Sequence, residues 1–65
     1  MRVGTKLRYI RYAVGISQRD LASIFGINRA RLEMYELGLE PMPQSLRDDL
    51  ERFFNLSDDY FSGLD

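Results

Sequence analysis

The tightest constraint on the fold is the three-residue connection Gly26-Ile27-Asn28, which lies between two segments with helical patterns. A glycine just past a helix ends it, and an asparagine caps the next helix by accepting from its free backbone N–H groups. So short a connection makes the two helices cross steeply. The sequence therefore predicts two helices arranged as in a helix-turn-helix.

Apolar residues at helical spacing indicate a helix before this pair. Val3, Leu7, Ile10 and Val14 recur every three or four residues, which places them on one side of a helix. Gly15 then supplies a stop. We expect these four apolar residues to face the core.

The first helix of the crossing pair is predicted to begin after Ser17. Ser17 is a favourable N-cap, and Asp20, three residues later, matches a capping box. The apolar side of this helix contains Leu21, Ala22 and Phe25. We therefore expect a helix up to Gly26 with that side buried.

The second helix of the pair is predicted to run from about Asn28 to Leu37. Leu32 and Tyr35 are its expected buried residues, together with the base of Glu36, and Gly38 ends it. Its other face is left for solvent or a ligand.

A proline-containing loop over residues 39–43 separates this helix from a fourth, which is predicted to begin near Pro43 or Gln44. The fourth helix has one apolar face and one charged face that we expect to lie mostly outside. The apolar residues are Leu46, Leu50, Phe53 and Phe54, and the charged ones are Arg47, Asp48, Glu51 and Arg52. A fifth short helix is predicted to start at the cap Ser57. The expectation is a single all-α domain over residues 1–65, a compact bundle of about five short helices.

Composition excludes several function classes. The chain has no cysteine and no histidine, so we expect no disulfide and no metal site of the common zinc type. It also has no Gly-rich phosphate loop, so we expect no enzyme activity, no cofactor and no small-molecule substrate. No apolar run approaches the roughly 20 residues that span a bilayer. We expect a cytoplasmic protein without a membrane partner.

Charge is strongly divided along the chain. Residues 1–31 carry seven Lys or Arg against one acid, Asp20, whereas residues 32–65 carry two Arg against nine acids. The net charge of −1 therefore conceals a basic half that can face phosphate and an acidic half that phosphate repels. Lopsided charge also arises by chance in short helical domains.

Several fragments together resemble a known family. They are K-L-R-Y-I-R (6–11), I-S-Q-R-D-L-A (16–22), F-G-I-N-R (25–29), Y-E-L-G (35–38), Pro41 and F-N-L-S-D-D-Y-F (54–61). In this order and spacing the chain resembles the Cro/C1-type, lambda-repressor-like helix-turn-helix family of phage repressors and bacterial regulators. The resemblance covers nearly the whole chain.

The resemblance implies sequence-specific binding of double-stranded DNA by a transcriptional regulator, expected to be a repressor associated with the nucleoid. Residues 18–25 would lie across the sugar-phosphate backbone, and residues 28–37 would be the recognition helix in the major groove. The residues expected to hold phosphate are Ser17, Gln18, Arg19, Asn28 and Arg31. The residues expected to face the bases are Arg29, Ala30, Glu33 and Met34.

The chemistry of these side chains leaves alternatives open. Arg29 can reach guanine O6 and N7 with its planar fork, or it can contact phosphate or solvent. Glu33 can accept from cytosine N4, but a pair with Arg29 four residues earlier is preferred. Ala30 and Met34 can make only apolar contacts, such as with a thymine methyl. Ser17 can serve as a helix cap alone.

The resemblance also implies two structural roles. Glu36 is expected to pair with Arg11 in a salt bridge between the first and third helices, in preference to a contact with DNA. A homodimer is expected on DNA, since one short recognition helix reads few base pairs. The candidate dimer contacts are Leu39, Met42, Tyr60 and Leu64.

The loop at residues 37–42 is apolar and acidic, and it can be a dimer contact, a partner surface or a segment folded on the core. The rival to DNA binding is a non-catalytic protein-interaction module that keeps the helix-turn-helix fold. The acidic second half and the apolar residues Leu37, Leu39 and Met42 favour that rival. Arg29 and Arg31 beside Gln18 and Arg19 favour DNA.

Overall fold

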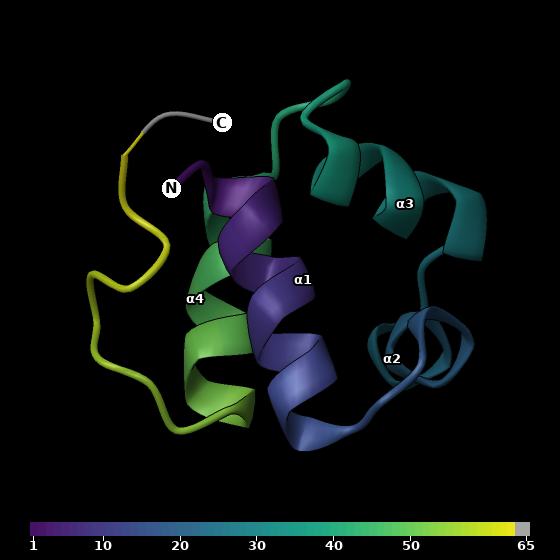
Figure 1. Ribbon diagram of the computed structural model, residues 1–65, viewed down its shortest axis with the longest axis horizontal. Coiled ribbons are helices and arrows are strands. Elements are labelled where there is room, and N and C mark those ends of the chain that lie inside the picture. Colours follow the sequence, from purple (N-terminus) through teal and green to yellow (C-terminus); the bar gives the residue numbers. More distant parts are fainter. Residues whose placement is uncertain (64–65) are drawn as a thin grey trace.

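Four α-helices make up the ordered framework of the computed structural model, which describes residues 1–63 (Figure 1). They are α1 (Val3–Val14), α2 (Gln18–Phe25), α3 (Arg29–Leu37) and α4 (Gln44–Phe53). The described residues contain no strand, which confirms the all-α class. The Cα radius of gyration is 10.4 Å, and a compact domain of this length is expected to have about 11 Å. No helix in this part of the chain is long and apolar enough to cross a membrane.

The predicted fifth helix is wrong for the described residues, because residues 58–61 form turns and residues 62–63 are not helical. The N–H of Tyr60 donates to the carbonyl of Ser57 at 3.2 Å and that of Ser62 to the carbonyl of Asp59 at 3.1 Å, two bonds of the tighter three-residue type. The N–H between them, that of Phe61, does not extend the first turn into a helix. It donates to the carboxylate of Glu51 on α4 at 2.8 Å.

The predicted caps around α2 and α3 are confirmed. Ser17 Oγ accepts from the N–H of Asp20 at 3.0 Å, and Asn28 Oδ1 accepts from the N–H of Ala30 at 2.7 Å. Gly26 has φ 66° and closes α2, with the N–H of Ile27 donating back to the carbonyl of Ala22 at 3.0 Å. The turn between α2 and α3 is therefore specified by local chemistry.

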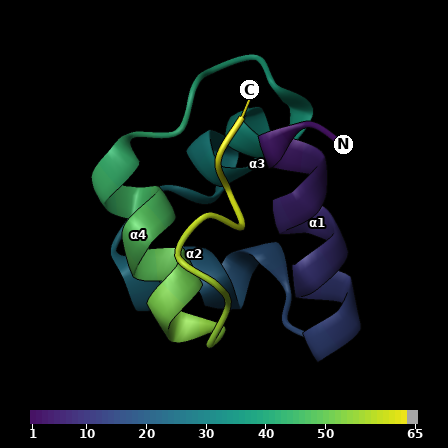
Figure 2. The same cartoon turned by 90° about the vertical axis from the view of Figure 1, so that its left-hand side faces the viewer.

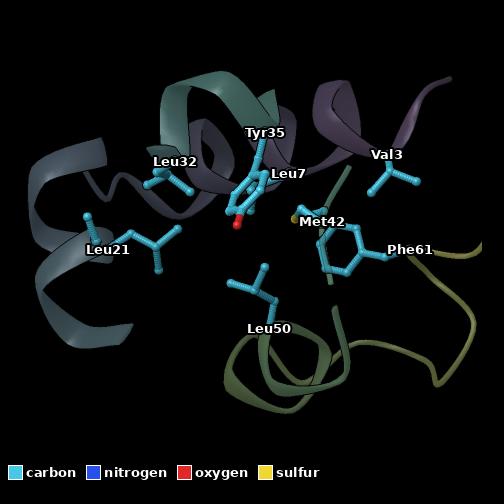
Figure 3. Close-up of a cluster of buried hydrophobic side chains, with 9 residues drawn as sticks. Val3, Leu7, Leu21, Leu32, Tyr35, Met42, Leu50 and Phe61 are labelled. Carbon is cyan, nitrogen blue, oxygen red and sulfur yellow. The ribbon is translucent and has the colours of Figure 1, made fainter. Parts of the chain in front are cut away.

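The core lies where all four helices and the C-terminal segment meet, as Figure 3 shows for its side chains. Its residues are Val3, Leu7, Leu21, Ala22, Leu32, Tyr35, Met42, Leu50 and Phe61. Most of the residues expected to be buried on α2 and α3 are in this set. On α1 the buried stripe continues from Leu7 to Arg11 rather than through Ile10, and Val14 at the end of the helix is 61% exposed. The expectation that Val14 faces the core is wrong.

Gly4 sets the distance between α1 and α3. A Cβ on this residue would lie 2.2 Å from the carbonyl oxygen of Tyr35 and 2.6 Å from that of Glu36. Real Cβ atoms do not approach backbone that closely, so only glycine lets the two helices pack here. This contact positions α3 on α1.

The C-terminal segment runs between α1 and α4 (Figure 2), and charged side chains hold its backbone. Lys6 Nζ donates to the carbonyl of Tyr60 at 2.9 Å, and Arg47 Nη1 donates to the carbonyl of Phe61 at 3.0 Å. Glu51 was expected to lie outside, but it is buried and accepts from the N–H of Phe61. That expectation is wrong because the amphipathic pattern of α4 does not reveal the donor that a distant segment brings to it.

Candidate nucleic-acid interface

A cleft of about 450 Å³ opens where the end of α1, the start of α2 and the outer side of α3 come together. Figure 1 shows these three helices on one side of the molecule. The lining residues are Arg8, Arg11, Tyr12, Ser17, Gln18, Arg19, Arg29, Glu33, Glu36 and Leu37. Four arginines stand against two glutamates, so the cleft carries a net positive charge and attracts anions.

A buried ion pair forms the floor of this cleft. Arg11 Nε lies 2.8 Å from Glu36 Oε2, and Arg11 Nη2 donates to Glu36 Oε1 at 3.2 Å. The hydrogen bond to Glu36 raises the pKa of Arg11 above its ordinary value. Arg11 Nη1 also donates to the carbonyl of Ile16 at 3.1 Å, in the turn before α2. The structure thus brings together the two residues expected to pair, and their pair joins α1, α3 and the start of α2.

Gln18 extends this pair to the surface. Its Nε2 donates to Glu36 Oε1 at 3.0 Å, while its Oε1 accepts from Arg29 Nη1 at 3.3 Å. Arg11, Glu36, Gln18 and Arg29 therefore form one hydrogen-bonded chain from the core to the exposed start of α3. The preferred pairing of Arg29 with Glu33 is wrong, since these two residues form no ion pair and Arg29 bonds across to α2 instead.

The four residues expected to face the bases are all exposed on α3. They are Arg29, Ala30, Glu33 and Met34. Only Arg29 and Glu33 also line the cleft. Ala30 and Met34 extend the same helix surface beyond it.

The residues expected to hold phosphate are spread over a wider area. Ser17 and Arg19 line the cleft at the start of α2, and within residues 1–63 Arg19 has no hydrogen-bond or ion-pair partner. Asn28 is exposed and its side chain caps α3. Arg31 lies away from the cleft, and its Nη1 is 3.0 Å from Glu40 Oε1. Tyr35 and Glu40 together raise the pKa of Arg31.

The candidate dimer contacts differ in their exposure. Leu39 is 69% exposed and Tyr60 is half-buried. Met42 is 4% exposed because the loop folds it onto the core, so the expectation that it contacts a partner is wrong. Leu64 lies outside the described residues.

Two cleft residues were not predicted from the sequence, Arg8 and Tyr12, and Leu37 was expected only as part of an apolar surface for a protein partner. Arg8 Nε donates to the hydroxyl of Tyr12 at 3.2 Å, and this bond is the main cause that lowers the pKa of Tyr12. The sequence does place an arginine and a tyrosine four residues apart on one helix face. That spacing alone does not reveal that Arg8 and Tyr12 line the cleft formed with α2 and α3.

Within the part of the chain that the structure describes, no group of three acidic residues is placed to hold a metal ion. The side chains that line the cleft offer hydrogen-bond donors and positive charge. Guanidinium, amide and hydroxyl donors there suit phosphate oxygens and the acceptors on base edges. Comparisons of the chain with models of protein families, with curated proteins and with solved structures found no match.

Proposed function

We propose that this protein binds double-stranded DNA sequence-specifically, with α3 in the major groove, and acts as a transcriptional regulator of the repressor type. One observation carries the proposal. A series of hydrogen-bonded side chains runs from Arg11 through Glu36 and Gln18, and Arg29 lies at its exposed end. A base-reading side chain discriminates only if its orientation is defined before binding. The bond from Arg29 Nη1 to Gln18 Oε1 restrains the guanidinium on the cleft, which supports this role.

The donors of Arg29 are suited to guanine. One bond through Nη1 goes to Gln18 and leaves the remaining donors of the planar group for a base edge. Arg19 and the free N–H groups at the start of α2 supply positive potential for the neighbouring phosphate. The resemblance to the Cro/C1-type family, stated from the sequence, gives α2 and α3 these same two roles.

The test begins with a selection of bound duplexes from a random DNA pool. Arg29→Ala should then cost about 1–3 kcal/mol on the selected site and relax selectivity at a single base position. Arg31→Ala is the matched control, because it removes the same charge from the same helix, away from the cleft. It should weaken binding to all sequences about equally and reduce the slope of log affinity against log salt by about one. Equal losses for Arg29→Ala on selected and scrambled duplexes would contradict base reading.

We further propose that the protein binds DNA as a homodimer on a roughly two-fold symmetric site. One α3 helix covers few base pairs, and two copies double the number that is read. Native mass spectrometry of the protein on the selected duplex should give two chains per duplex. One chain per duplex at saturation would refute the dimer.

A protein-interaction module is the second candidate, favoured by two exposed leucines next to α3. Leu37 is 54% exposed and Leu39 is 69% exposed. Apolar surface of this kind suits a protein partner better than a polyanion. If the unmodified protein selects no duplex from the pool, this candidate replaces DNA binding.

A further inference from the structure

The exposed flank of α1 presents an arginine and a tyrosine joined to each other. Arg8 Nε donates to the hydroxyl of Tyr12 at 3.2 Å, one helical turn away. The guanidinium of Arg11 lies 4.8 Å from the centre of the Tyr12 ring, and that of Arg8 lies 5.5 Å from it. Both guanidinium groups are close enough for a cation–π contact with the ring.

The pair has hydrogen-bond donors to spare. Within residues 1–63 the side chain of Arg8 bonds only through Nε, so both of its terminal nitrogens remain for a ligand. The hydroxyl of Tyr12 accepts from Arg8, which leaves its own proton free to donate. The adjacent arginines lower the pKa of Tyr12, and a more acidic phenol donates more strongly to an anion.

The placement of the pair connects it to the proposed DNA surface. Arg8 and Tyr12 line the same cleft as Ser17, Gln18 and Arg19, but they come from α1, outside the α2–α3 helix pair. No acidic side chain pairs with Arg8 within the described residues, so its positive charge is not neutralised. A phosphate that enters the cleft would have donors on both walls.

We propose that Arg8 and Tyr12 form a further phosphate-binding site on α1, which holds the DNA backbone opposite the start of α2. This inference rests on the proposed DNA binding. Arg8 supplies the charge and two parallel N–H donors, and Tyr12 supplies a neutral O–H donor in a fixed position. The structural alternative is a surface pair that only stabilises α1 by its four-residue spacing.

DNA affinity over a salt series separates the two roles. Arg8→Ala should weaken binding roughly tenfold at low salt and lower the slope of log affinity against log salt by about 0.9, the value for one phosphate. Tyr12→Phe keeps the ring and loses the hydroxyl, so affinity should fall a few-fold with the slope unchanged. Arg8→Lys should restore most of the slope.

The control is Arg52→Ala on α4, which removes one exposed arginine that pairs with Asp49 and does not line the cleft. It should leave both affinity and slope as in the unmodified protein. Ethylation of single phosphates in the duplex should reveal one position whose modification weakens the unmodified protein but not Arg8→Ala. An unchanged slope for Arg8→Ala, with DNA binding intact, would overturn this site alone. Absence of DNA binding by the unmodified protein would overturn the proposed function as well.

Discussion

Two regions of the molecule, the cleft and the C-terminal segment packed on α4, each depend on one buried glutamate, and the two carboxylates have different partners. Glu36 on α3 accepts from the side chains of Arg11 and Gln18, so it links the core to the cleft. Glu51 on α4 accepts from the backbone N–H of Phe61 and fixes the C-terminal segment. The first glutamate organises side chains that can meet a ligand, whereas the second completes the fold.

The basic residues of the two regions differ in the same way. Lys6 and Arg47 donate to backbone carbonyls of the C-terminal segment. Arg8, Arg19 and Arg29 line the cleft without an acidic partner among residues 1–63. The basic side chains at the C-terminal segment are therefore used to bind backbone within the fold, whereas those of the cleft remain available for a ligand. Substitutions at the C-terminal segment should therefore lower stability, whereas substitutions of the exposed cleft residues should lower DNA affinity.

The largest expected effect is on the ion pair at the cleft floor. Glu36→Ala should lower the free energy of unfolding by about 3–5 kcal/mol, because it strands the buried charge of Arg11. Urea denaturation measures this directly. The double variant Arg11→Leu, Glu36→Leu should recover part of the loss, since no charge is then buried. Wild-type stability for Glu36→Ala would show that the pair does not hold α1 to α3.

The contact between α1 and α3 backbones gives the next largest effect. Gly4→Ala should cost about 3 kcal/mol, the upper end of the range for overpacking, because the three nearest atoms that the new Cβ meets all belong to backbone. Thr5→Ala, on the exposed side of the same helix, is the control and should change stability by less than about 0.5 kcal/mol. Equal melting temperatures for the two variants would contradict the close approach of the helices.

The second buried glutamate should matter less and only for stability. Glu51→Ala leaves the buried N–H of Phe61 without an acceptor and should cost about 2 kcal/mol. Glu51→Gln keeps an acceptor oxygen and should cost less than half as much. Because Glu51 does not line the cleft, neither variant should alter the salt slope of DNA binding in conditions where the protein is folded. A changed slope would show that the two regions are not separate.

The smallest expected effect concerns the exposed pair of Arg31 and Glu40. Glu40→Gln frees Arg31 for a phosphate and should raise DNA affinity by about 0.2–1 kcal/mol at low salt, the range for exposed ion pairs. In the Arg31→Ala background, Glu40→Gln should not raise DNA affinity in this way, because no arginine is left to be freed. A gain of equal size in both backgrounds would assign it to the removed negative charge alone.

Features set by neighbouring residues could be predicted from the sequence. The Ser17 and Asn28 caps, the stop at Gly26 and the start of α4 depend on short-range hydrogen bonds and backbone preferences. The Arg11–Glu36 pair was expected only from the family resemblance. Local pattern alone does not pair residues 25 positions apart.

Features set by distant contacts were missed. Among the described residues, Glu51 is buried where it accepts from the N–H of Phe61, and the same N–H is thereby not used to continue the turn after Ser57 into a helix. For Met42 the sequence left both a dimer contact and packing on the core open, because the composition of a loop does not reveal which side chains face inward. The link from Gln18 to Arg29 depends on how α2 and α3 cross, and for that reason the sequence favoured the local partner Glu33 instead.

The most direct test of the account is a titration of the ¹⁵N-labelled protein with its selected duplex, followed by amide chemical shifts. If DNA occupies the cleft, the amides of Gln18, Arg19 and Ala30 should shift most, together with that of Tyr12 on α1. The amides of Asp48 and Arg52 on α4 should remain nearly unchanged. Shifts concentrated on α4 or on the loop at Leu39, with the start of α2 unaffected, would contradict the claim that this cleft is the DNA-binding surface.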